Sequence, residues 1–171
     1  DAEDNCPRIN NPDQGDRDED GRGDVCDACP DQYDDGRIGC PASIRQIKTR
    51  SLNTDQLYSV SGIVTAVLPQ NAPSSQAGSF FMQVPPQDSS GEGYEGIFVY
   101  MGNRSQGLPI PNPGQTVVVS AIYADFFGQA QLTRVSAIEI SDTGESPAPE
   151  QVEILTLSRG QEAREGMLIC V

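Results

Sequence analysis

An acidic loop of twelve residues, 16–27, limits more than any other feature what this chain can fold into. Acidic side chains occupy positions one, three, five, nine and twelve of the loop, and Gly21 occupies position six. Calcium loops use this spacing, because the ion needs six to eight oxygens and position seven, here Arg22, supplies a backbone carbonyl. The sequence therefore predicts a calcium site whose side-chain ligands are Asp16, Asp18, Asp20, Asp24 and Asp27.

Two other interpretations of this loop fit the sequence less well. Acidic runs are commonly solvated linkers, but five acids at the correct offsets with a glycine at position six are not expected of a linker. A helix–loop–helix calcium motif needs amphipathic helices on both sides, and Pro12 and Pro30 argue against those helices. We therefore expect a calcium loop without flanking helices.

The negative charge of the chain is concentrated at its N-terminal end. Of the net charge of −14, residues 1–40 contribute −9, from 13 acidic and 4 basic residues, and the other residues contribute −5. Such an acidic surface makes nucleic acid an unexpected partner, because a phosphate backbone is bound by basic residues. No apolar run is long enough to span a membrane. The expected partners are calcium ions and either other protein subunits or an extracellular ligand.

Four of the five cysteines fall in the acidic segment: Cys6, Cys26, Cys29 and Cys40. This segment has too few apolar residues to form a core, so disulfides and calcium must hold it in shape. That combination indicates an oxidising, calcium-rich space outside the cytosol. Zinc bound through Cys26 and Cys29 is the alternative, but the chain has no histidine and its dense oxygen ligands suit calcium better.

Several motifs of residues 1–27 occur together in one known family. Asp4-Asn5-Cys6-Pro7, Asn11-Pro12-Asp13-Gln14 and the acidic loop together resemble the thrombospondin type 3 repeat. The resemblance implies an extracellular array with little regular secondary structure, wrapped around a string of calcium ions. It also implies a disulfide between Cys6 and Cys26. Further candidate ligands, some at the spacing of a preceding loop, are Asp1, Asp4 and Asp13.

Residues 28–41 keep two cysteines but lose the alternating aspartates. Only Asp31, Asp34 and Asp35 remain, which argues against a complete calcium site there. The segment resembles the short unit that ends such arrays in bacterial proteins, and this implies a disulfide between Cys29 and Cys40. The resemblance thus implies a bacterial protein that is secreted or held at the cell surface.

From residue 42 onward, β-branched and aromatic segments alternate with glycine, proline and asparagine turns, as is typical of an all-β domain. No segment has a helical period. The fold class that we predict is mostly β, with an irregular, calcium-bound and disulfide-linked arm over 1–41 followed by a five-stranded Greek-key barrel over 42–142. The predicted strands are 44–49, 57–68, 79–84, 96–101, 115–123 and 130–140.

The strand motifs at 60–65, 78–83 and 96–100, with the run 126–132, resemble the oligonucleotide/oligosaccharide-binding (OB) barrel that precedes the catalytic domain in some secreted bacterial nucleases. A helix often bridges strands three and four of such barrels, but 102–114 contains three prolines and predicts none. A small barrel needs large core side chains, so we expect packing rather than ligand stacking from the aromatic residues. These are Phe80, Phe81, Phe98, Tyr100, Phe126 and Phe127.

Residues 143–171 predict a linker and the start of a further β segment, with strands over 151–157 and from 165. The chain ends in an apolar strand, which suggests a truncation, a processed fragment or a subunit of an assembly. The odd cysteine is Cys170. Its partner is absent or in another subunit, or its thiol is buried and reduced.

No catalytic constellation is found, because a chain without histidine has no Ser-His-Asp or Cys-His set. We therefore expect no enzyme. The sequence predicts an extracellular structural or adhesion module, in which a calcium-stiffened arm presents a β-barrel within a surface or matrix assembly. The alternatives are the accessory region of a secreted nuclease or phosphoesterase, and a subunit of an extracellular filament joined by strand addition.

Overall fold

The computed structural model describes seven stretches of the chain, separated by short gaps: residues 4–27, 29–33, 39–69, 76–102, 107–141, 147–151 and 161–170. Its elements in chain order are β1 (Cys40–Pro41), α1 (Ile44–Lys48), β2 (Leu57–Val67), β3 (Phe80–Gln83), the 3-10 helix η1 (Pro86–Asp88), β4 (Gly96–Val99), β5 (Thr116–Phe126), β6 (Gln129–Ser141), β7 (Glu150–Gln151), α3 (Gln161–Arg164) and β8 (Ile169–Cys170).

Five strands close into a barrel, in the order β2-β3-β4-β6-β5 and back to β2. The pairs β2–β3, β3–β4, β5–β6 and β2–β5 are antiparallel. The hairpin β5–β6 is turned so that β6, not β5, lies next to β4, and these two strands run parallel. This order makes an OB-like Greek-key barrel, so the predicted mostly β fold is confirmed. The short strand β1 adds to the outside of β2.

The barrel interior is filled by alternate residues of each strand. In β5, for example, Val117, Val119, Ala121 and Tyr123 are all at most 1% exposed. Each such aliphatic or aromatic side chain stabilises the fold by roughly 1.5–3 kcal/mol when fully buried. The barrel therefore draws its stability from apolar packing.

The expectation that all the aromatic residues pack in the core is wrong for most of them. Only Phe80 is fully buried, whereas Phe81 and Phe98 are partly exposed and face each other across β3 and β4, with ring centroids 4.9 Å apart. At the tip of the β5–β6 hairpin, Phe126 is 58% and Phe127 is 95% exposed. Phe81 and Phe98 are partly exposed because side chains alternate between the two faces of a strand. Phe126 and Phe127 are exposed because they lie at the turn of the hairpin.

The strand predicted over 44–49 is instead the helix α1. Ser43 caps it, with its side chain accepting from the Gln46 N–H while the Gln46 side chain accepts from the Ser43 N–H. This is a capping box, which the motif Ser-x-x-Gln could have indicated. Ile44 and Ile47 share one face of the helix and are buried in the core at 1% and 0% exposure.

The C-terminal segment 161–170 packs against the barrel, and it contains the helix α3, which was not expected. Gly96 and Gly166 touch so closely that a Cβ on Gly96 would lie 2.5 Å from the Met167 nitrogen. The Leu168 N–H donates to Gln83 Oε1 at 3.0 Å.

The strand expected from 165 begins only at Ile169, in β8, which pairs in parallel with β7. Residues 152–157 of the other predicted strand, and the side chain of Cys170, lie outside the described parts of the chain.

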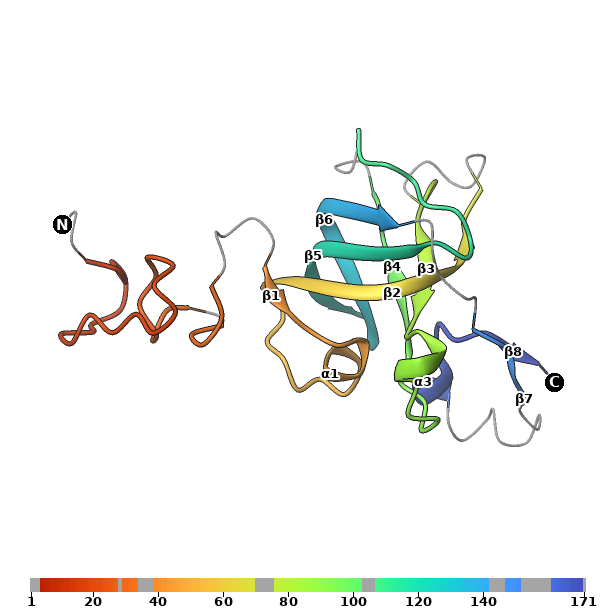
Figure 1. Ribbon diagram of the computed structural model, residues 1–171, viewed down its shortest axis with the longest axis horizontal. Coiled ribbons are helices and arrows are strands. Elements are labelled where there is room, and N and C mark those ends of the chain that lie inside the picture. Colours follow the sequence, from red (N-terminus) through yellow and green to blue (C-terminus); the bar gives the residue numbers. More distant parts are fainter. Residues whose placement is uncertain are drawn as a thin grey trace.

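The acidic N-terminal segment lies at one end of the molecule, beside β1, and β7 and β8 lie at the opposite end (Figure 1). The disulfide between Cys29 and Cys40 ties the last described part of this segment to β1, and Cys29 packs partly against the barrel core. Within the described parts of the chain, the helices are all too short or too polar to cross a bilayer.

Candidate metal centre

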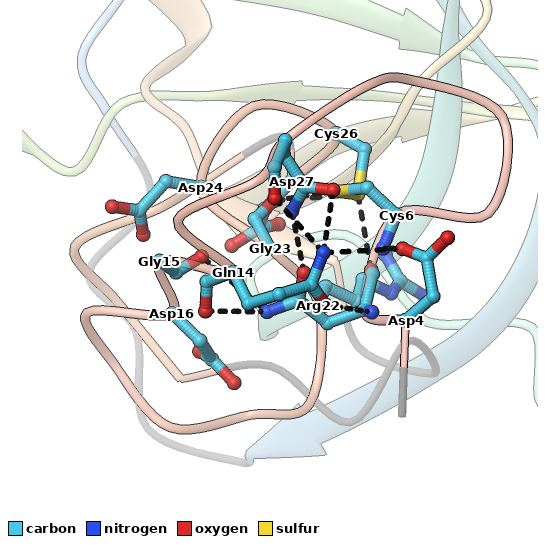
Figure 2. The surroundings of a disulfide bond; sticks show 12 residues. Asp4, Cys6, Gln14, Gly15, Asp16, Arg22, Gly23, Asp24, Cys26 and Asp27 are labelled. Atoms are coloured by element: carbon cyan, nitrogen blue, oxygen red, sulfur yellow. Dashed lines mark hydrogen bonds between the residues drawn. A yellow bond between two sulfur atoms is a disulfide. The ribbon is translucent and has the colours of Figure 1, made fainter. Parts of the chain in front are cut away.

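Residues 4–27 contain no helix or strand and fold as a series of tight turns. The Cys6–Cys26 disulfide lies at their centre, with Gly23 beside it (Figure 2), and Cys6 is only 1% exposed. This pairing and that of Cys29 with Cys40 agree with the sequence prediction. Since Cys26 and Cys29 belong to different disulfides, neither the Cys26–Cys29 bridge nor a zinc site on their thiolates is formed.

Three amide side chains hold the turns together. Asn11 donates to Asn5 Oδ1 at 2.6 Å, and Gln14 donates to the Asn11 carbonyl at 2.9 Å. Asn5 donates to the Gln14 carbonyl at 3.0 Å and accepts through its own carbonyl from the Gly23 N–H at 3.0 Å. Asn11 is 5% exposed. Sequence reasoning used these residues for the family resemblance but missed this role, although their fixed spacing around Pro12 was visible.

Asp16, Asp18 and Asp20 come together in the acidic loop, as their alternate spacing predicts. One oxygen from each lies within 4.8 Å of the others, and all three residues are half-buried. Calcium–oxygen distances are about 2.3–2.6 Å, so oxygens on opposite sides of one ion are about 4.6–5.2 Å apart. The cluster therefore has the dimensions that a single calcium ion needs.

In three aspartates of the loop, one carboxylate oxygen is hydrogen-bonded to the backbone and the other is not. One oxygen accepts a backbone N–H: Asp16 from Gly21 at 3.0 Å, Asp18 from Asp20 at 3.2 Å, and Asp27 from Cys29 at 3.1 Å. The other oxygen is shielded from solvent and has no donor among the described residues: Asp16 Oδ1, Asp18 Oδ2 and Asp27 Oδ2. Shielded carboxylate oxygens without a donor are costly, and a bound cation removes that cost.

The electrostatics of Asp18 agree with this arrangement. Its pKa is raised above the ordinary value of 3.8, first because the carboxylate is shielded from water and also because the Asp20 and Asp27 carboxylates lie near it. Backbone N–H groups of Asp20 and Gln32 act in the opposite direction but do not cancel this increase. Without a metal ion, the surroundings of Asp18 disfavour its ionised form, and a bound cation would stabilise that form. The converging carboxylates of Asp16, Asp18 and Asp20 therefore fit a hard divalent cation, and the Asp27 carboxylate lies near enough to Asp18 to affect its charge.

Other predicted ligands lie elsewhere. Asp24 accepts from the Arg17 N–H at 2.9 Å, and the Arg17 side chain reaches Asp24 at 3.8 Å and also pairs with Asp31. Position nine often binds calcium through a water molecule, which is compatible with this placement. Arg22 is exposed and donates its N–H to Asp20 Oδ1 at 2.8 Å.

Of the remaining candidates, before the loop, Asp4 and Asp13 do not join the cluster either. Asp4 accepts from the Cys6 N–H at 3.0 Å, and Asp13 is exposed. Figure 2 shows Asp4 beside Cys6, with the Asp16 and Asp24 carboxylates pointing away from the disulfide. Asp1 lies outside the described residues.

No family model and no curated protein sequence matches the chain. Among solved structures, it is similar to the hypothetical protein ygiW from E. coli, with 15% identity and a TM-score of 0.41 over 60% of this chain and 91% of that chain. It is also similar to the OB domain of MM0293 from Methanosarcina mazei, with 14% identity and a TM-score of 0.42 over 54% of this chain and 79% of that one. A third similarity is to the S. pombe Stn1–Ten1 complex, with 18% identity and a TM-score of 0.33 over 51% of this chain and 59% of that one. Similarities of this size carry no argument about function.

Proposed function

We propose that this protein is an extracellular calcium-binding structural module, in which a calcium-stiffened arm carries an OB-like β-barrel. The observation that carries the proposal is the set of three carboxylate oxygens, on Asp16, Asp18 and Asp27, that are shielded from solvent and lack a donor among the described residues. The other oxygen of each of these carboxylates accepts a backbone N–H, so the shielded oxygens are pre-oriented for a ligand that the described protein groups do not supply.

The chemistry of the donor set favours calcium over the other common divalent ions. All the converging donors are carboxylate oxygens, which suit hard cations, whereas zinc sites favour thiolate or imidazole ligands. Magnesium demands near-octahedral geometry and retains several waters, whereas calcium accepts an irregular set from a flexible loop. The turn at Gly21, with φ of 94°, brings the first carboxylates around such an ion.

The two disulfides support a location in an oxidising space, and the resemblance of residues 1–27 to thrombospondin type 3 repeats supports an extracellular one. Such a space also supplies calcium at the millimolar level that weak extracellular sites need. A structural or adhesive role in a surface or matrix assembly follows, with the arm as a spacer and the barrel as the part that meets a partner.

Calorimetric titration of the oxidised protein with calcium tests this proposal. We expect a dissociation constant on the order of 10⁻⁴–10⁻³ M, with much weaker heat from magnesium. Asp18→Asn should weaken calcium binding at least about tenfold, because it removes one charged ligand from the cluster. Glu19→Gln is the matched control, since Glu19 is the exposed neighbour in the same loop and should bind as the wild type does. Equal affinities for wild type and Asp18→Asn would overturn the assignment.

A further inference from the structure

A second site of interest lies at the other end of the molecule from the arm. A cavity of about 260 Å³ opens between the loop that follows β3 and the C-terminal segment. Pro86, Ala148 and Met167 contribute apolar wall, and Glu95 and Glu150 contribute two carboxylates. The volume falls just below the range of roughly 300–1,000 Å³ typical of small-molecule sites, so only a small ligand fits.

The charges around this cavity do not balance. Three basic side chains lie near it, and each is paired with its own carboxylate: Arg45 with Glu92 at 2.6 Å, Lys48 with Glu165 at 2.7 Å, and Arg164 with Glu150 at 2.9 Å. Glu95 is more buried than any of these carboxylates, at 3% exposure, yet no cation contacts it among the described residues. Burying an ionised carboxylate without a counter-charge is costly.

Glu95 is nonetheless held in its ionised form. Its Oε1 accepts from the Ser90 N–H at 2.6 Å, the Ser90 hydroxyl at 2.8 Å and the Gly91 N–H at 3.2 Å. Its Oε2 accepts from the Ser89 hydroxyl at 2.6 Å. Burial alone would raise the pKa of Glu95, but these hydrogen bonds outweigh burial and lower the pKa below the ordinary value of 4.5. The wall of the cavity therefore carries a fixed negative charge at neutral pH.

The pattern of donors selects the kind of cation. Oε1 already accepts three hydrogen bonds, so acceptor capacity remains mainly on Oε2, which accepts one. A single acceptor oxygen suits an ammonium group, whereas a guanidinium presents a planar fork of donors that needs two free oxygens. Because Arg164 already neutralises Glu150, the only carboxylate of the described cavity lining without a paired cation is Glu95, and one positive charge on a ligand would balance it.

We propose that this cavity binds the ammonium end of a small unbranched alkylamine, with the alkyl chain against Pro86, Ala148 and Met167. The source is either a free amine or the side chain of a lysine on a partner protein. The proposal goes beyond the calcium-binding function and is independent of it, because no residue of the cavity belongs to the arm. If Glu95 instead serves only to fix the turn at 89–91, the cavity will not distinguish an amine from an alcohol.

The test is an NMR titration of the ¹⁵N-labelled, calcium-loaded, oxidised protein with n-butylammonium chloride at constant ionic strength. We expect saturable shifts of the Ser90 and Gly91 amides and of the Met167 methyl group, with a dissociation constant on the order of 1 mM. n-Butanol and n-butylguanidinium should bind at least about tenfold more weakly. Nα-acetyl-lysine methylamide separates the two sources: binding as strong as that of n-butylammonium supports a lysine side chain, and exclusion supports a free amine.

Two variants locate the site. Glu95→Gln should reduce the affinity for n-butylammonium at least about tenfold, because it removes the charge while keeping the shape. Asp88→Asn is the matched control, since Asp88 lies in the same loop, is exposed and does not line the cavity. Ala148→Phe fills the cavity from its exposed side without touching the donors of Glu95, so it should abolish binding even if Glu95→Gln unfolds. Unchanged affinity in Ala148→Phe, or equal affinity for butanol and butylammonium, would overturn the proposal.

Discussion

Single residues of the arm are packed so tightly that a larger side chain would not fit, and Gly23 is the clearest case. Gly23 lies against the disulfide and the amide network: a Cβ there would lie 2.6 Å from Cys6 Sγ and 2.7 Å from Asn11 Nδ2. None of these neighbours is free to move, because Cys6 is covalently bound and Asn11 is buried. Gly23 thus allows the disulfide and the amide side chains to pack closely in an arm that has no apolar core.

Gly23→Ala should therefore destabilise the arm by about 1–3 kcal/mol, the usual cost of overpacking. Limited proteolysis of the oxidised, calcium-loaded protein would show this as faster cleavage within residues 4–27. Gly15→Ala is the control, because its Cβ would meet only the ends of the Asp24 and Asp13 side chains, at 3.3 and 3.8 Å, and should have a smaller effect. Equal cleavage rates for the two variants would contradict the packing argument.

Glu95 gives the barrel a dependence on pH. The fold lowers its pKa below 4.5, so its stabilising contribution is complete above that pH and is lost as the pH falls towards the folded-state pKa. Glu95→Gln should cost on the order of 1–3 kcal/mol at pH 7, and this difference from wild type should shrink below pH 4.5. Urea unfolding of both proteins between pH 7 and pH 3 measures it, and a difference independent of pH would contradict it.

Among the elements, an ion pair with one buried partner joins the C-terminal segment to α1. The Lys48 side chain in α1 is 1% exposed and pairs with Glu165, which is 32% exposed. Glu165→Ala should destabilise the protein by up to about 3 kcal/mol, because it leaves the ammonium group buried and unpaired. Glu92→Ala, which breaks the exposed pair with Arg45, should cost less than about 0.5 kcal/mol. Thermal unfolding compares the two, and similar losses would show that burial of Lys48 is not decisive.

The sequence predicted the strands of the barrel well, because alternating burial is a local pattern that each strand displays by itself. It failed at α1, where the spacing of Ile44 and Ile47 and the Ser43–Gln46 capping box both indicate a helix, although the segment is short and rich in β-branched residues. Prediction also failed for Phe126 and Phe127, since a hairpin tip places side chains by turn geometry and not by hydrophobicity. The packing of residues 161–170 depends on contacts with residues about 70 or more positions away, such as Gly96 and Lys48, which no local pattern contains.

The candidate metal centre was predictable to a similar extent. The alternate spacing of Asp16, Asp18 and Asp20 brings them together because a tight loop is determined locally. The position of Asp24 was not predictable from spacing, since it depends on the Arg17 N–H. The Glu95 cavity was not predicted at all, because its walls come from two segments that are far apart in the chain.

At the scale of the whole molecule, the two ends are stabilised by different forces. The arm has one buried disulfide, an amide network and a cluster of carboxylates, whereas the barrel has a continuous apolar core. Chelation of calcium should therefore expand the arm, because its carboxylates repel one another and little apolar burial opposes this. The barrel should keep its β signal in circular dichroism, and small-angle scattering should report a larger radius of gyration.

The Cys29–Cys40 disulfide is the control for that experiment, because it ties the arm to β1 whether or not calcium is bound. Reduction together with chelation should loosen the arm further and still leave the barrel folded. Cooperative melting of the barrel upon chelation alone would contradict the separation of the two stabilising forces.

Anomalous diffraction from crystals grown with calcium would show directly whether the shielded oxygens of the acidic loop hold the ion. We expect an anomalous peak about 2.3–2.6 Å from oxygens of Asp16, Asp18, Asp20 and Asp27. The backbone hydrogen bonds of Asp16, Asp18 and Asp27 should remain in place. A map at saturating calcium that shows no peak there, with Asp18 Oδ2 bonded to water or to a protein donor instead, would show that the loop does not hold calcium.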